Sequence, residues 1–495
     1  MKLAVSRSLH SRARDGPEQR STATVPHETF GYSFGLMPLG ANNPDGPVNE
    51  VAEQDRPKGA LSGELLRRSA RNWWALAIFL IAAATVTIHP PYANSPPIRS
   101  DGLGYHAWTR AILDGNISFC PYVELETVDA LEPVSALGRC ANKYPPGLAL
   151  LRFPIMAPFT SANHGALRST AEDRVSQILS VLAGAIAMGA AISAAARLGA
   201  SRRTANLAAL GVMFGTNEFH FATYDGSFTH IYSAAIVGLL LVLGIGVGQS
   251  SRPPNLRTVV AISLLTGLLV DIRMMLVAPL MVSALVLLAV SVRRSSVRDT
   301  IRRFGPLMCS AGGAVALALL QQLWYNHYIF GSWKLSAYAG EDFIWSQYKQ
   351  LDVLFYVYKG AFWWSPFIPI ALVAGLLARR YLLTILMAAV VLSLAVIYGA
   401  WHSWNLAGGF GHRGFVEPSA LYAVTLAASA ETLPRLGRRA IAVASVLATI
   451  VILGLMRAYW AGDIGFSGAS WSEYVRFGMG RDSLLPHYLR ELINR

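Results

Sequence analysis

Charged side chains are scarce in this sequence. Asp, Glu, Lys and Arg together make up 14% of its 495 residues, against about 25% in an ordinary soluble domain, while hydrophobic residues make up 53%. Heptad repeats, a Gly-Xaa-Gly-Xaa-Xaa-Gly run and a phosphate-cradling Gly-Lys-Ser element are all absent from the sequence. The composition excludes a water-soluble globule, and the missing motifs exclude a nucleotide-binding domain in this chain.

Apolar runs long enough to cross a membrane recur along the chain. A hydrocarbon core of about 30 Å is spanned by about 20 residues of helix, which rises about 1.5 Å per residue. The sequence therefore predicts an all-α integral membrane bundle of about eleven helices, with juxtamembrane helices in the first external loop. The predicted spans lie near 72–89, 174–196, 204–221, 228–247, 258–272, 275–292, 304–325, 361–378, 381–400, 414–433 and 440–459. Because Asp271-Ile272-Arg273 splits the stretch 258–292, a re-entrant pair is an open alternative there.

The net charge of +13 is unevenly distributed. Arginines gather in every second connection: Arg197, Arg202, Arg203, Arg252, Arg257, Arg293, Arg294, Arg298, Arg302, Arg303, Arg379, Arg380, Arg435, Arg438 and Arg439. The positive-inside rule places these connections and the N-terminus in the cytoplasm, so that loops 90–173, 222–227, 326–360 and 401–413 face outward. We expect a disordered cytoplasmic tail over 1–70, a transmembrane domain over 71–460 and an external tail over 461–495. The basic charge is interpreted as a topology signal rather than as a nucleic-acid surface.

The three cysteines are informative through their positions. Cys120 and Cys140 fall in the first loop predicted to face outward, whereas Cys309 lies inside an apolar run. In an oxidising compartment the pair would close a loop of about 20 residues and contribute roughly 3 kcal/mol in the chain-entropy model. Because no Cys-Xaa-Xaa-Cys spacing indicates a metal or redox site, we expect a disulfide between Cys120 and Cys140. Two unpaired small residues are the alternative.

A carboxylate and a lysine share the first predicted outer loop. Asp101 follows shortly after the first apolar run, and Lys143 begins the stretch Lys143-Tyr-Pro-Pro-Gly147 in the same loop. Ionisable residues held against a membrane are costly and are retained mainly where they have a function. The pairing favours a membrane enzyme over a passive channel or scaffold.

Short motifs follow one another along the chain in a recognisable order: Asp101-Gly-Leu-Gly-Tyr105 with Trp108 and Gly115, Lys143-Tyr-Pro-Pro146, Asp173 to Ser180, Tyr224-Asp225-Gly226-Ser227 with His230, Arg273 before Pro279, Tyr325-Asn326 with Phe330-Gly331-Ser332, and Gly411-His412-Arg413 before Pro418. Their order, over about 70–430, resembles the glycosyltransferase C superfamily. The similar branches are the protein O-mannosyltransferase-like enzymes of the family 39/83 type and the lipid A aminoarabinose-transferase-like enzymes. Two departures stand out: Gly102 occupies the position where the family often has a second acid, and Tyr144 is inserted into a basic-proline pair.

The resemblance implies a glycosyltransferase of the bacterial inner membrane. Such an enzyme moves a hexosyl or pentosyl group from a polyprenyl-phosphate sugar to a glycan, lipid or protein acceptor on the outer, periplasmic side, with inversion at the anomeric carbon. Asp101 takes the catalytic position. The substrate-binding positions are Tyr105, Lys143, Tyr144, Asp225, Arg273, His412 and Arg413.

The chemistry of such a transfer agrees with these residue types. A polyprenyl phosphate is a good leaving group, so the site needs a base for the attacking hydroxyl and fixed positive charge for the phosphate. Asp101 is the expected base, and Lys143, Arg273 and Arg413 are the candidate cations. Arg273 lies near the outer leaflet against the positive-inside trend and needs an anion. Asp271 is two residues away and cannot face it on a regular helix, so the sequence favours a lipid phosphate as its partner.

Each assignment has an alternative. Asp101 could cap a juxtamembrane helix, and Arg413 could extend to lipid headgroups. A divalent metal is an open alternative, because Asp225 or Glu218 could bind one together with histidines predicted near the outer face: His106, His220, His230, His327, His402 and His412. Glu341-Asp342 is interpreted as a solvated surface. For the whole chain, the alternatives are a transporter or flippase of a lipid-linked or small solute and an inactive scaffold, although no internal repeat of the transporter kind is found.

Overall fold

The computed structural model describes residues 73–88, 97–123, 131–160, 167–335, 337, 341–480 and 482–483. The chain divides into two units, Met1–Ala60 and Leu61–Arg495, and all described residues belong to the second. The tail expected over 1–70 lies outside the described residues, as does the chain beyond 483.

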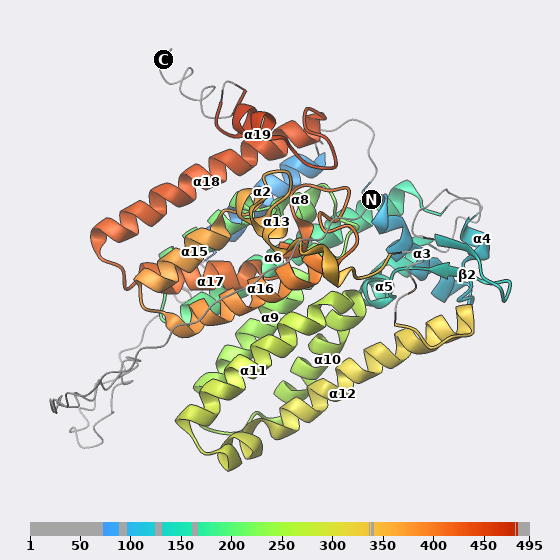
Figure 1. Ribbon diagram of the computed structural model, residues 1–495, viewed down its shortest axis with the longest axis horizontal. Helices are drawn as coiled ribbons and strands as arrows, with labels where there is room; N and C mark the ends of the chain where they lie inside the picture. Colours follow the sequence, from blue (N-terminus) through green and yellow to red (C-terminus); the bar gives the residue numbers. More distant parts are fainter. Residues whose placement is uncertain are drawn as a thin grey trace, which may run out of the picture. The chain divides into compact units, whose positions relative to one another are not determined.

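Helices occupy each of the predicted spans (Figure 1). They are α2 (Trp74–Ile88), α6 (Thr170–Arg197), α7 (Arg202–Gly215), α9 (His230–Gln249), α10 (Leu256–Ile272), α11 (Val277–Arg294), α12 (Val297–Phe330), α15 (Phe367–Leu377), α16 (Tyr381–Ala400), α17 (Ser419–Ala430) and α18 (Arg435–Ala461). Within the described part of the chain, six helical segments are long and apolar enough to cross a membrane: α6, α9, Met274–Arg294, α12, α16 and α18. The fold is thus an all-α, polytopic membrane bundle.

Two predicted spans are broken near the ends that carry the sequence motifs. The span 204–221 divides into α7 and α8 (Glu218–Thr223), and the span 361–378 divides into α14 (Ala361–Trp364) and α15. At the second break, Ser365 donates a hydrogen bond of 3.2 Å from its hydroxyl to Asn217 Oδ1 at the first. This side-chain hydrogen bond ties the two breaks together.

The predicted external loop 90–173 contains juxtamembrane helices, as the sequence predicts, and in addition a β-hairpin. The juxtamembrane helix α3 (Asp101–Leu113) is followed by α4 (Cys120–Val123) and an antiparallel pair, β1 (Leu131–Val134) and β2 (Cys140–Asn142), with Leu131 opposite Asn142. An apolar helix, α5 (Gly147–Thr160), then completes the loop. The sequence analysis missed α5 because the helix is short and contains Pro154 and Pro158.

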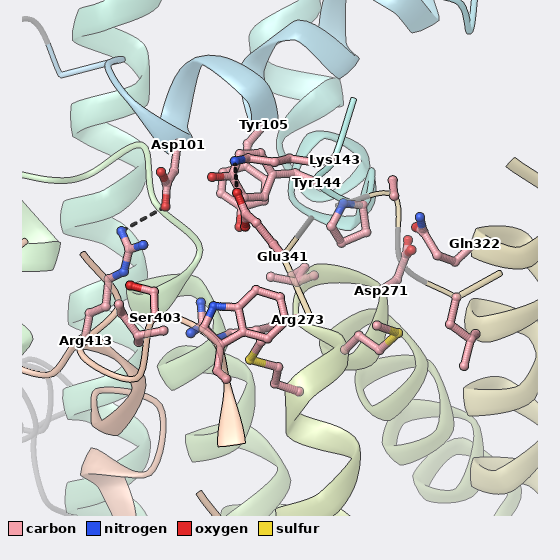
Figure 2. Close-up of a pocket in the computed structure, with 18 of the residues that line it drawn as sticks. Asp101, Tyr105, Lys143, Tyr144, Asp271, Arg273, Gln322, Glu341, Ser403 and Arg413 are labelled. Carbon is pink, nitrogen blue, oxygen red and sulfur yellow. Dashed lines mark hydrogen bonds and ion pairs between the residues drawn. The ribbon is translucent and has the colours of Figure 1, made fainter. Parts of the chain in front are cut away.

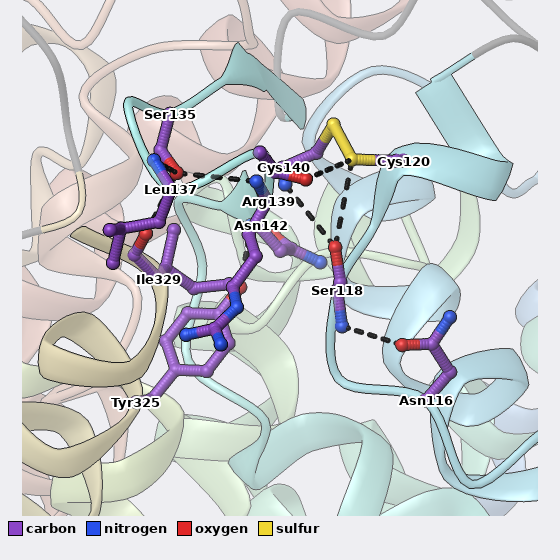
Figure 3. Close-up of a disulfide and its surroundings, with 11 residues drawn as sticks. Asn116, Ser118, Cys120, Ser135, Leu137, Arg139, Cys140, Asn142, Tyr325 and Ile329 are labelled. Atoms are coloured by element: carbon purple, nitrogen blue, oxygen red, sulfur yellow. Dashed lines mark hydrogen bonds between the residues drawn. A yellow bond between two sulfur atoms is a disulfide. The ribbon is translucent and has the colours of Figure 1, made fainter. Parts of the chain in front are cut away.

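A disulfide closes this loop, as the sequence leads us to expect (Figure 3). The Cα atoms of Cys120 and Cys140 are 4.8 Å apart. The hairpin next to the disulfide is docked on the end of α12, because the Asn142 amide donates to the Tyr325 hydroxyl at 2.8 Å. Cys309 is exposed on α12.

The arginine-bearing connections meet at one end of the bundle. Arg197 at the end of α6 donates to the Val242 carbonyl of α9 at 2.9 Å, and Arg303 in α12 donates to the Val247 carbonyl of α9 at 2.8 Å. The side-chain caps Ser201, Asn255 and Ser296 each accept a backbone N–H at the start of α7, α10 and α12. A cap of this kind contributes about 0.5–2 kcal/mol to a helix start.

The break at Arg273 separates two consecutive helices, α10 and α11. α10 begins at the arginine-bearing end, and α11 returns to that end at Arg293 and Arg294. Both lie alongside α12 (Figure 1). The 3₁₀ turn η1 (Met274–Leu276) joins them at the opposite end, where the sequence motifs gather.

The side of the membrane on which each end lies remains a prediction, and it can be tested by fusions. Reporters placed after Arg203, Arg303 and Arg439 should read as cytoplasmic, and those after Gly331 and Trp471 as external, because arginine-rich loops resist translocation. Alkaline phosphatase activity and fluorescence from a green fluorescent protein give opposite signals on the two sides. An external signal at Arg303 would place the motif-bearing end in the cytoplasm.

The disulfide can be counted by mass labelling. In the Cys309→Ser variant, denatured under non-reducing conditions, maleimide should add no mass, and after reduction it should add two adducts. The variant removes the free thiol and leaves the bridge as the only source of signal. Two adducts without reduction would show that Cys120 and Cys140 are unpaired.

Candidate active site

A cavity of about 910 Å³ opens at the motif-bearing end of the bundle (Figure 2). The start of α3, the Lys143 turn, the break between α10 and η1, the upper part of α12 and the loop after α16 line it. Six of the eight predicted site residues line the cavity: Asp101, Tyr105, Lys143, Tyr144, Arg273 and Arg413. The other two, Asp225 and His412, are not part of its lining.

Asp101 is the first residue of α3, and its side chain points into the cavity toward Arg413 (Figure 2). Asp101 Oδ2 and Arg413 Nη1 are 2.8 Å apart. The cap position of α3 is held by Ser100, at a left-handed φ of 46°, and no side chain caps the helix. The capping alternative for Asp101 is therefore wrong. Burial favours the neutral acid, but the Arg413 guanidinium and the Tyr144 hydroxyl hold the pKa of Asp101 below its ordinary value of 3.8.

Arg413 enters the cavity from the 3₁₀ turn η3 (Arg413–Phe415). The preceding Gly411 adopts a left-handed φ of 61°, and a Cβ at this position would lie 2.8 Å from the Cβ of Trp364. Only glycine fits both conditions, which fixes the approach of the chain to Arg413. Because the guanidinium pairs with Asp101 inside the cavity, the alternative in which Arg413 extends to lipid headgroups does not hold.

Arg273 already has an anion within the protein. Its Nε lies 2.9 Å from Glu417 Oε1, and its Nη2 donates to the Tyr398 hydroxyl at 2.8 Å. His230 Nδ1 lies 2.8 Å from the same Glu417 oxygen. The sequence favours a lipid phosphate as the partner of Arg273, whereas the structure supplies an anion within the protein, Glu417. Glu417 was missed, although a lone acid beside an apolar stretch was a visible signal.

Lys143 is paired across the cavity with Glu341, at 2.9 Å between Nζ and Oε1. Glu341 was interpreted as part of a solvated surface, and this interpretation is wrong because the residue lines the cavity. Trp108 donates from its indole to the Tyr144 carbonyl at 2.7 Å, which holds the turn that carries Lys143. The rings of Tyr105 and Tyr144 pack with centroids 4.4 Å apart and form one wall.

Gly102 stands where the family that the sequence resembles often has a second acid, and the packing around Gly102 leaves no space for a side chain. A Cβ at Gly102 would lie 2.5 Å from the Cβ of Ser227 and would overlap its hydroxyl oxygen. The start of α3 is thus pressed against the Tyr224–Ser227 turn. A second carboxylate beside Asp101 has no room.

Asp225 and His412 belong to a network behind the cavity wall. Asp225 pairs with Arg99 at 2.6 Å and with His220 Nε2 at 2.8 Å. Burial disfavours its charged form, but Arg99 and His220 hold the pKa of the carboxyl well below its ordinary range. His412 Nε2 lies 3.0 Å from the Trp404 carbonyl and anchors the loop before Arg413. The structure thus gives both residues internal partners away from the cavity.

The histidines do not assemble into a metal site in the part of the chain that the structure describes. No group of three His, Cys, Asp or Glu residues there could hold a metal ion. His106 pairs with Glu172, His220 with Asp225 and His230 with Glu417, each in a separate place. At the cavity, the carboxylates of Asp101 and Glu341 are already paired with Arg413 and Lys143, and Asp271 lies at the other side, so they form a poor donor set for a divalent cation. We derive no step through a metal.

Lys359 is a buried cation that the sequence analysis missed. It is 1% exposed, and its ammonium donates to the Ala407 carbonyl in the loop that lines the cavity. Leu406 and Ala407 both adopt left-handed φ values, of 56° and 48°. Burial first, and Arg413 second, lower the pKa of Lys359 to about 7. The lysine therefore holds a strained loop segment at the cavity edge.

Comparisons with known proteins give structural matches. No protein-family model matches the chain, and no curated protein matches it. ArnT from Cupriavidus metallidurans, in the apo state, has 12% sequence identity and a TM-score of 0.45 over 83% of this chain and 75% of its own. The same protein bound to undecaprenyl phosphate matches 82% of this chain and 75% of its own, with a TM-score of 0.45 and 12% identity.

A second match is the archaeal oligosaccharyltransferase AglB from Archaeoglobus fulgidus, in complex with an inhibitory peptide and a dolichol-phosphate. Its TM-score is 0.47 at 12% identity, over 81% of this chain and 57% of AglB. Both ArnT and AglB belong to the glycosyltransferase C superfamily. The motif order of this sequence resembles the same superfamily. At such identities and TM-scores, the activity of this chain has to be argued from its own cavity.

The Arg273–Glu417 pair gives a prediction about stability. Arg273→Met leaves the buried Glu417 carboxylate without its cation and should destabilise the protein by about 3–5 kcal/mol. The double variant Arg273→Met with Glu417→Gln should recover most of the loss, because the neutral amide still bonds to His230. Thermal unfolding in detergent measures both.

The matched control is Lys349→Met, which breaks the exposed pair of Lys349 and Asp352 and should change the melting temperature little. If the Arg273 variant is as stable as the control, the pair is not a structural requirement.

Proposed function

We propose that this chain is a membrane glycosyltransferase that moves a sugar from a polyprenyl phosphate to an acceptor hydroxyl at the motif-bearing end of the bundle. The observation that carries the proposal is that Asp101 lines a single cavity together with three basic side chains: Lys143, Arg273 and Arg413. This set provides a proton acceptor and fixed positive charge, the two requirements of transfer from a phosphate leaving group.

The proposed reaction is a single displacement. The acceptor oxygen forms a bond to the anomeric carbon while the bond from that carbon to the phosphate oxygen breaks, and its electron pair stays on the phosphate. The proton of the acceptor hydroxyl passes to Asp101. One displacement at the anomeric carbon inverts its configuration.

Arg413 has two roles in this proposal. Before substrate binds, it neutralises Asp101 at 2.8 Å. When a phosphate enters, the guanidinium engages the phosphate oxygens, as its planar fork geometry favours. Asp101 then loses part of its stabilising partner and becomes a stronger base. Donor binding and activation of the base are thus linked through one side chain.

The donor lipid and the sidedness follow from the same proposal. A cavity at a helix end in the membrane suits a donor whose phosphate lies at the bilayer surface and whose chain lies in the hydrocarbon core. The arginine-rich connections lie at the opposite end, which supports an external, periplasmic site in a bacterial inner membrane. A hexosyl or pentosyl group and a glycan, lipid or protein acceptor are consistent with the cavity.

Asp101→Asn tests the proposal directly. The amide keeps the size of the side chain but takes up no proton at neutral pH, so transfer should fall by about a hundredfold to ten-thousandfold. In a deletion strain, mass spectrometry of the lipids should show an accumulated polyprenyl-phosphate sugar that the wild-type gene clears and Asp101→Asn does not. Binding of undecaprenyl phosphate by the purified variant should persist.

The matched control is Asp114→Asn at the other end of the same helix, where the carboxylate accepts a hydrogen bond from Tyr122 away from the cavity. It should clear the accumulated lipid as the wild type does. Full complementation by a stable Asp101→Asn protein would remove the catalytic role and favour a transporter or flippase instead.

A further inference from the structure

The cavity has a second polar end that the proposed reaction does not use. Figure 2 shows Asp101 and Arg413 at one side and Asp271 and Gln322 at the other. Asp271 is near the end of α10 and Gln322 is in the upper part of α12, and both line the cavity. Asp271 lies in the motif that precedes Arg273 but has no role in the proposed reaction, and Gln322 lies outside the sequence motifs.

Both residues carry a buried acceptor that receives no hydrogen bond. These atoms are Asp271 Oδ1 and Gln322 Oε1, within the part of the chain that the structure describes. The amide nitrogen of Gln322 donates within its own helix, to Asn326 Oδ1 at 3.4 Å, which leaves the oxygen as the group available to a ligand. Leaving a buried acceptor unsatisfied costs about 1–3 kcal/mol, so two in one cavity indicate a binding requirement.

Asp271 also differs from the other carboxylates of the cavity. Asp101 pairs with Arg413, and Glu341 pairs with Lys143. For Asp271, no ion pair with a cation is found among the described residues, and Arg273 is directed to Glu417 instead. A carboxylate without a cation in a partly buried cavity is costly, and it is expected to face a ligand.

The turn that carries Lys143 also fixes the position of Asp271. Gly147, at the end of that turn, packs directly on the end of α10, since a Cβ there would lie 2.5 Å from the Asp271 carbonyl carbon and the Ile272 nitrogen. The backbone of the turn that carries Lys143 is therefore held against the backbone at Asp271. One end of the cavity supplies cations and the other supplies acceptors.

We propose that Asp271 and Gln322 form a subsite for the hydroxyl or amino groups of the transferred sugar, remote from its phosphate. This assignment rests on the proposed glycosyl transfer. A carboxylate repels a phosphate. A hydrocarbon chain would displace water from the two acceptor oxygens and offer them no hydrogen-bond donor. A sugar presents O–H or N–H donors, which satisfy both oxygens at once.

The test compares two forms of one lipid. Undecaprenyl phosphate binds through its phosphate alone, whereas undecaprenyl phosphate that carries a neutral hexose, or a glucosamine, adds donors at the far end. In the proposal, Asp271→Asn weakens binding of the glycosylated lipids by about tenfold to a hundredfold, because the carboxylate makes charge-assisted hydrogen bonds, and Gln322→Met weakens it by about tenfold, because the amide bond is neutral. Binding of the unsubstituted lipid should stay within about twofold. Native mass spectrometry of the full chain in detergent gives both affinities.

The matched control is Gln321→Met, which removes a neighbouring buried acceptor that is equally unpartnered but does not line the cavity. It should leave all three affinities unchanged. The Asp271→Asn variant should also melt no lower than the wild type, since it removes an uncompensated buried charge, and a structural role for Asp271 would lower its melting temperature instead.

The outcomes separate the hypotheses. A loss for both glycosylated lipids supports recognition of hydroxyl groups, and a loss confined to the glucosamine lipid supports recognition of an ammonium group. Unchanged binding of both glycosylated lipids to the Asp271 and Gln322 variants overturns the subsite while the proposed function stands. If the wild type binds none of the three lipids, the proposed function fails, and the subsite fails with it.

Discussion

The ion pair between Arg273 and Glu417 is the constraint on which the candidate site depends. A cation at a break between two membrane helices needs an anion at close range, because the low dielectric leaves little other stabilisation. Glu417 supplies it at 2.9 Å and also contacts His230, while Tyr398 accepts from the same guanidinium. These contacts join four segments under the cavity: the end of α10, the start of α9, the end of α16 and the residues just before α17. Arg413 precedes Glu417 by four residues, so the pair that anchors Glu417 also helps to place Arg413 opposite Asp101.

Much of the fold was predictable because a membrane helix satisfies its own backbone. Each apolar run therefore predicts a helix independently of the neighbouring helices. The arginine-rich connections indicate which helix ends lie on the same side of the membrane. The failures have physical causes. α5 is short and contains two prolines, so that it lacks the length signal. The breaks at Thr216 and Ser365 depend on a hydrogen bond between segments far apart in the sequence, which no local pattern contains.

The site was predictable in its residue types but not in its pairings. Asp101, Lys143, Arg273 and Arg413 were singled out by chemistry and motif order, and the structure brings them to one cavity. Their partners were not visible, because Glu341 lies 198 residues from Lys143 and a contact at that separation is set by tertiary packing. The opposite error concerns Asp225. Its motif suggested a substrate contact, yet Arg99 and His220 occupy its carboxylate behind the wall. The order of motifs along the sequence predicts which loop forms the site. The burial of each side chain and its ion-pair partner determine whether that side chain can contact a substrate.

The paired charges have a further consequence for ligand binding. Each of the three cations that could hold a phosphate already contacts a carboxylate: Arg413 with Asp101, Lys143 with Glu341, and Arg273 with Glu417. An unpaired cation in this position would be costly before a ligand arrives, whereas a paired one is stable and ready. Binding of an anion is then an exchange of partners rather than the neutralisation of a bare charge. The exchange is easiest where the resident carboxylate is partly exposed, as for Asp101 and Glu341, with side-chain exposures of 22% and 28%, and hardest at Glu417, which is fully buried. Arg413 and Lys143 are therefore the cations that can turn to a phosphate, and Arg273 remains the fixed positive charge beneath it.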